Sequence, residues 1–183
     1  MNELIVNGAF TLGGFLMSVA YEKLKDRYQF KRELKQNNEI DLTGFDWVAA
    51  WQTSVESKEL INTEKLLIEQ KGSLVNMRNT AKSPENPKGG YKWVARLQFY
   101  HGRDLMGHYF AEKEEQNNNK GIMYFSYQSA KKEFIGRWVG TGHDGPLQSG
   151  FAVISKNREQ SLQRLNEILK AHPNKVSIIS YSI

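Results

Sequence analysis

The chain has 183 residues, of which 39% are hydrophobic and 11% aromatic, enough for one folded domain plus an attachment rather than a disordered chain. Its 25 Lys and Arg residues against 20 Asp and Glu give a net charge of +5. This balance suits an anionic membrane surface, a phosphate-bearing ligand or an ordinary basic surface, and it is too mild for a nucleic-acid polymer as partner. The absence of cysteine excludes disulfide scaffolds, zinc–cysteine sites and thiol nucleophiles, and favours the cytoplasm.

The first element of the chain is an uncharged stretch, Leu4 to Tyr21. As a helix it would extend about 27 Å, the thickness of a thin bilayer, so we expect a transmembrane helix. Two alternatives remain open. Residues 18–20 resemble the end of a signal peptide, although no basic residue precedes them. A buried helix of a soluble fold is the other alternative, although paired glycines at Gly13 and Gly14 would weaken it.

Small residues in this stretch have the spacing that lets membrane helices pack closely, Ala9 with Gly13 and Gly14 with Ser18. Basic residues follow the stretch and none precedes it, which predicts a single pass of the inner (cytoplasmic) membrane with the remainder of the chain in the cytoplasm. Residues 22–36 favour a continuation of the same helix, whose basic side chains either bind lipid headgroups or form a solvated face. We therefore assign residues 1–40 to a helical membrane and juxtamembrane region.

From Phe45 to Lys156 the hydrophobic pattern changes to a period of two, which is typical of β-strands. Short polar or turn-like segments separate eight such strands. We expect them at Phe45–Val55, Glu64–Gln70, Ser73–Thr80, Tyr91–Tyr100, Leu105–Glu112, Gly121–Ser129, Phe134–Thr141 and Gln148–Ser155. No crossover helix interrupts them, so the pattern predicts a mostly β fold. The expected domain, 41–183, is a small antiparallel, lipocalin-like eight-stranded β-barrel.

Two further elements are predicted after the barrel strands. Residues Arg158–Ala171 are expected to form an amphipathic helix, with Leu162, Leu165, Ile168 and Leu169 on one face. Residues Val176–Ser182 are expected to form a last strand that closes the barrel or pairs with its edge, because such an apolar strand would aggregate if exposed.

Motifs for catalysis are absent from the sequence: it has no phosphate-binding glycine loop, nucleophile elbow or HExxH. None of the four histidines is spaced with another as a metal pair. The adjacent His143 and Asp144 are the nearest approach to an acid–base pair, but neighbours in a loop are seldom oriented for that role. We expect no enzyme, no metal and no cofactor.

Arginine and aromatic side chains on the strands are the best candidates for a ligand site. Arg96 and Arg137 each lie mid-strand between hydrophobic neighbours. Pointing outward they would be ordinary solvated residues; pointing inward they would need a carboxylate or an anionic ligand. With stacking aromatics, the inward arrangement suits a nucleotide-sized ligand with phosphates, although most barrel aromatics simply fill the interior. The candidate ligand-binding residues are Arg96, Arg137, Trp51, Tyr109, Tyr124 and Asn76, with Asn79, Gln98 and Ser126 as further polar candidates.

The order of a hydrophobic helix, a basic stretch and a barrel with the strands GRWVG and SGFAVIS resembles the transmembrane β-barrel effectors of bacterial anti-phage signalling (CBASS). The phrases NTEKL, SPENPKGGYKW and KGIMYF are also similar to that family, and the resemblance spans essentially the whole chain. The family usually has two membrane helices, whereas one segment here has the length to span. The resemblance implies a barrel that binds a cyclic nucleotide from a partner synthase and a chain that self-associates and disrupts the inner membrane.

Two other functions remain open at this point. The barrel could be a lipocalin-like binding module for an apolar or amphipathic small molecule, tethered to lipid without disrupting it. It could also be an adaptor whose interior is filled and whose partner is a protein.

Overall fold

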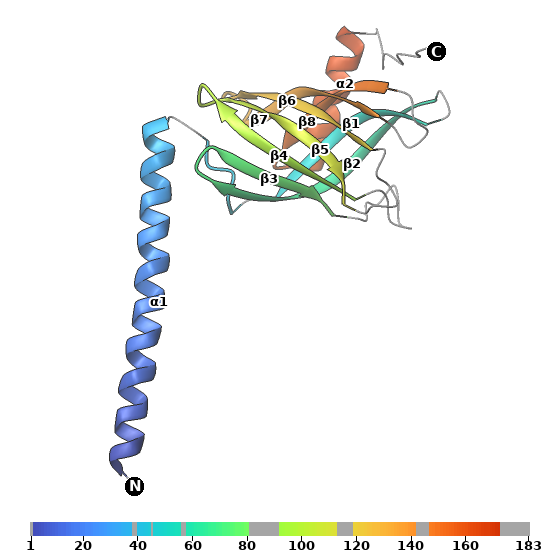
Figure 1. The fold of residues 1–183 in the computed structure, drawn as a ribbon. Helices are drawn as coiled ribbons and strands as arrows, with labels where there is room; N and C mark the ends of the chain where they lie inside the picture. Colours follow the sequence, from blue (N-terminus) through green and yellow to red (C-terminus); the bar gives the residue numbers. More distant parts are fainter. Residues whose placement is uncertain are drawn as a thin grey trace.

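The chain consists of a long helix, an eight-stranded barrel and a second helix, in that order (Figure 1). The computed structural model describes residues 2–37, 40–44, 46–55, 58–80, 92–112, 119–141 and 147–172. Within these ranges, the side chains of residues 2–16, 33, 36–37, 54–55 and 58–60 are not described.

All eight predicted strands are present, and together they close into one antiparallel barrel. They are β1 (Trp47–Val55), β2 (Lys58–Lys71), β3 (Leu74–Asn79), β4 (Trp93–Tyr100), β5 (Asp104–Ala111), β6 (Lys120–Gln128), β7 (Glu133–Thr141) and β8 (Leu147–Ser155). Each strand pairs with the next, and β1 closes the barrel on β8, with Trp51 opposite Ala152. The predicted fold class is thus confirmed for the barrel. The largest difference is β2, which begins at Lys58 instead of Glu64.

The two ends of the barrel are built differently. At one end, which we call the tight-turn end, β2–β3, β4–β5 and β6–β7 are joined by two to four residues. Positive φ angles at Gly72 (56°) and Gly102 (73°) permit the first two of these turns. We call the other end the mouth; the connections β1–β2, β3–β4, β5–β6 and β7–β8 are made there. The mouth is therefore bounded by the ends of β1, β3, β5 and β7 and the starts of β2, β4, β6 and β8.

The half of the interior next to the tight-turn end is packed with large apolar side chains. Trp47, Phe99 and Tyr127 all pack around Phe134, with ring centroids 6.0, 6.3 and 4.9 Å from its ring. Gly136 allows the strands to approach closely here, because an added Cβ would overlap the carbonyl oxygen of Tyr124 on β6. This half of the barrel is solid.

The segment between the first helix and β1 covers the tight-turn end. The indole Nε1 of Trp47 donates to the carbonyl oxygen of Leu42 at 3.0 Å, and Leu42 N donates to Gln70 Oε1 at 2.8 Å. Gln70 Nε2 also donates to the carbonyl oxygen of Ile40 at 3.0 Å. The chain that follows the helix is therefore held against the barrel by side chains of β1 and β2.

Helix α2 (Arg158–Ala171) has the predicted bounds and packs across β1 and β8. Asn157 caps it, accepting from the backbone N–H of Glu159 at 2.8 Å. Its apolar face, centred on Leu165, covers Ala50 and Val153 on the outside of the barrel. The predicted last strand, Val176–Ser182, lies outside the described residues.

Helix α1 (Asn2–Asn37) confirms the predicted helix at the start of the chain and projects away from the barrel (Figure 1). Its 36 residues correspond to about 54 Å. Among the helical residues that the structure describes, no stretch is both long and apolar enough to cross a bilayer. Of the predicted packing positions, Ala9, Gly13 and Gly14 fall where side chains are not described, and Ser18 is exposed.

Candidate functional site at the mouth of the barrel

The six predicted ligand-binding residues fall on two sides of the barrel wall. Trp51 and Tyr109 face inward and are 7% and 6% exposed. Arg96 and Arg137 face outward, with their guanidinium carbons 5.5 Å from the ring of Phe110 and 4.1 Å from that of Phe151. The outward alternative therefore applies to both arginines, and neither contributes to the interior.

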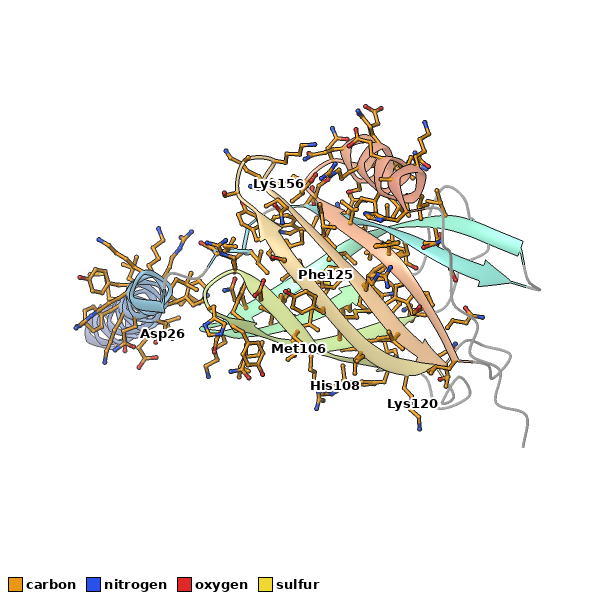
Figure 2. The ribbon with its side chains drawn as sticks, turned by 90° about the horizontal axis from the view of Figure 1, so that it is seen from above. Asp26, Met106, His108, Lys120, Phe125 and Lys156 are labelled. Atoms are coloured by element: carbon orange, nitrogen blue, oxygen red, sulfur yellow. The ribbon has the colours of Figure 1, made fainter. Side chains whose placement is uncertain are left out.

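The remaining two predicted residues accompany the arginines on the outer wall. Exposed Asn76 lies opposite Arg96, and exposed Tyr124 lies opposite Arg137. Figure 2 shows Met106 and His108 on this outer wall, while Phe125 is buried inside the barrel. The structure thus does not bring the six residues together as one site.

A partly buried carboxylate, that of Glu64 on β2, organises one side of the mouth. Its Oε2 accepts hydrogen bonds from the indole N–H groups of Trp51 (3.0 Å) and Trp93 (2.9 Å). Its Oε1 accepts from the amides of Asn62 (3.2 Å) and Asn79 (3.1 Å). Since a carboxylate offers about four lone-pair sites, these four donors saturate it. The two indole rings meet edge to face, with centroids 5.3 Å apart.

Burial raises the pKa of Glu64 above its ordinary value of 4.5, although the four donors partly oppose this effect. The folded chain therefore retains this proton to a higher pH than the unfolded chain does. The contribution of Glu64 to stability is accordingly greatest at low pH and is lost as the pH rises through the raised pKa.

A Glu64→Gln variant should reveal this dependence. We expect the unfolding free energy of the wild type, minus that of the variant, to fall as the pH rises from about 4.5 and to level off above the raised pKa. Denaturant unfolding of both chains between about pH 4 and pH 8 measures the difference. A difference that stays constant or grows with pH would contradict the assignment.

The opposite side of the mouth is formed by one rung of residues across β5–β8. Tyr109, Gly121, Gly140 and Gln148 follow one another as cross-strand partners. A Cβ on Gly140 would overlap the hydroxyl oxygen of Tyr109, so this hydroxyl lies against Gly140, directly beside Gln148 in the rung. The Tyr109 ring meets Trp138 edge to face at 6.4 Å.

Two polar groups on this rung are buried and have no side-chain partner among the residues that the structure describes. Tyr109 is 6% and Gln148 8% exposed. Neither the phenol hydroxyl nor the glutamine amide makes a side-chain hydrogen bond in the described part of the chain. Burial raises the pKa of Tyr109 far above its ordinary value, so the phenol is a neutral hydroxyl. Such groups are rare in folded proteins, where nearly all buried polar groups are paired.

Four residues of this site were missed by reasoning from the sequence: Asn62, Glu64, Trp93 and Gln148. Strand alternation could have indicated two of them, because Glu64 shares a face with Leu66, and Gln148 shares one with Ala152. Asn79, which was named as a polar candidate, is part of the mouth. Within the described ranges, no group of three His, Asp or Glu side chains has a metal-binding arrangement.

Comparisons with known proteins add no identity to this geometry. No protein-family model matches the sequence, and a search of curated proteins finds no relative.

Proposed function

We propose that this chain is a membrane-anchored effector in which the barrel binds a cyclic nucleotide at its mouth and α1 carries the response to the inner membrane in anti-phage defence. The observation that carries the proposal is the contrast within the barrel. Apolar side chains fill the half next to the tight turns and continue to the mouth. Only at the mouth are they joined by the carboxylate of Glu64, the amides bound to it and two buried polar groups that have no side-chain partner among the described residues. A few placed polar groups among aromatic side chains are typical of the lining of small-molecule sites.

The electrostatics of the mouth favour one orientation of a nucleotide. The acidic group described at the mouth is Glu64, whose carboxylate in its ionised form would repel phosphate groups. Lys120, by contrast, is exposed at the mouth end of β6 (Figure 2). We therefore place the base inside the mouth, against the aromatic and amide groups, and the phosphates at its rim.

Helix α1 supports the second half of the proposal. Met17, Tyr21, Leu24 and Tyr28 are 67–74% exposed. Their spacing of four, three and four residues is that of a helix–helix seam. An apolar stripe of this size is typical of a contact with another surface, so we propose that lipid or further copies of α1 cover it. Membrane contact and self-association are both properties of the effectors that the sequence resembles.

The proposal predicts that ligand binding and membrane damage depend on different parts of the chain. Full-length protein in vesicles of phosphatidylethanolamine and phosphatidylglycerol should release a trapped dye when a cyclic dinucleotide is added. A chain lacking residues 4–21 should still bind the same dinucleotide in calorimetry but should release no dye and should leave the membrane fraction. Binding without any release from the full chain would contradict the effector role.

An adaptor barrel with a protein partner is the second candidate, and one observation favours it. The outer wall exposes Leu74 (58%), Met106 (44%), Ile122 (62%) and Tyr124 (46%) on neighbouring strands, around a partly solid interior. Such a patch is typical of a protein contact. If no cyclic dinucleotide binds the full chain, this candidate replaces the first.

A further inference from the structure

We propose that Gln148 and Tyr109 hold the edge of the ligand's nucleobase at the mouth, an inference that rests on the nucleotide ligand proposed above. The geometry starts from the rung across β5–β8. Gln148 and Tyr109 lie at its two ends, and the two residues between them, Gly121 and Gly140, have no side chain. The Tyr109 hydroxyl spans this gap and reaches Gly140, which is the cross-strand neighbour of Gln148. Both polar groups are therefore brought to one place.

The chemistry of these groups selects the kind of ligand. A glutamine amide offers a donor beside an acceptor, and a phenol hydroxyl can serve as either. Nucleobases present a donor and an acceptor side by side along their edges, and glutamine pairs with such an edge through two bonds. A phosphate, which only accepts, would leave the amide oxygen of Gln148 unmatched.

The other wall of the mouth cannot perform this task. Glu64 is saturated by the N–H groups of Trp51, Trp93, Asn62 and Asn79, so it has no acceptor site left for a ligand. Its role is to fix the two indole rings in place. Base recognition is therefore assigned to the side of the mouth whose polar side chains have no side-chain hydrogen bond among the described residues.

Substituting these groups should change stability and ligand affinity in opposite directions, which gives a test. Removing a buried polar group that has no partner should stabilise the ligand-free protein, whereas removing a ligand contact should weaken binding. We expect Tyr109→Phe and Gln148→Leu each to raise the Tm of the ligand-free full chain by about 2 °C. Each should also lower the affinity for a cyclic dinucleotide about tenfold.

The experiment uses full-length chain in detergent micelles, calorimetry with cyclic dinucleotides carrying adenine, guanine or uracil, and inorganic phosphate as the base-free probe. Tyr100→Phe and Gln98→Leu, both exposed on the outer wall, are the matched controls and should change neither quantity. If both mouth variants bind the dinucleotide with the affinity of the wild type, the base contact is contradicted while the proposed function is not. A Tm below that of the wild type in both variants also contradicts the base contact, because the two groups would then stabilise the fold itself. Absence of dinucleotide binding by the wild type overturns the proposed function and this inference together.

Discussion

Replacing Trp47 by alanine is expected to lower the free energy of unfolding of the barrel by about 3–5 kcal/mol. Trp47 is 1% exposed and packs edge to face against Phe134, so its removal leaves a cavity in the solid half of the interior. The substitution also removes the indole donor that holds the carbonyl of Leu42 at 3.0 Å. Urea unfolding of the full chain, followed by far-ultraviolet circular dichroism, measures the loss.

The matched variant for this prediction is Trp47→Phe. It keeps most of the contact with Phe134 and loses the hydrogen bond to Leu42, so we expect a cost of about 1–2 kcal/mol. If the alanine variant lost no more than the phenylalanine variant, the interior next to the tight turns would not be close-packed, and the division of the barrel into a solid half and a mouth would fail.

Replacing Arg164 by alanine is the second large effect, with an expected loss of about 3 kcal/mol. Glu133 on β7 is 0% exposed, and its Oε1 accepts from Arg164 Nε at 3.0 Å. Without the guanidinium, the longer hydrogen bond from Gln160, 3.3 Å away, is the one that the described residues still give to the buried carboxylate. An unpaired buried charge is expensive, so α2 should loosen from the barrel. Hydrogen exchange of the α2 amides together with urea unfolding measures both effects.

Two further variants test whether the loss of stability comes from the unpaired charge or from the packing of α2. Glu133→Gln combined with Arg164→Ala removes the buried charge as well and should recover most of the lost stability. Glu167→Gln changes an exposed partner of the same arginine and should leave the free energy of unfolding nearly unchanged, because exposed ion pairs contribute little. A double variant no more stable than Arg164→Ala would show that the arginine contributes through packing instead of charge.

The strands could be predicted because their burial alternates so regularly. In β4, Trp93, Ala95, Leu97 and Phe99 are buried and the residues between them are less so, and short polar links left no room for a crossover. The start of β2 could not be predicted in the same way. Residues 58–63 carry no apolar alternation in the sequence, and their strand is fixed by pairing with β1, where Val55 lies opposite Lys58. Pairing of this kind depends on tertiary structure.

The candidate site was harder to predict than the fold. The sequence left the direction of Arg96 and Arg137 open, although both alternate with residues that turned out to be buried, such as Trp138. Glu64 was not considered, since a carboxylate in a strand normally faces solvent. Its burial depends on donors from three other positions far along the chain, Trp51, Asn79 and Trp93. No local pattern in the sequence indicates that these side chains converge.

The covering of the tight-turn end by the segment after α1 has a mechanical consequence. The backbone of Ile40 and Leu42 is hydrogen-bonded to Gln70, so α1 joins the barrel at the end of the strands opposite the mouth. About eight residues of strand, roughly 25 Å, lie between the two ends. In the proposed effector, crowding of α1 helices from several copies would therefore not block the mouth. β1 and β2 would then be the shortest connection between a ligand and α1, because Trp47 and Gln70 contact the segment after α1 while Trp51 and Glu64 lie at the mouth.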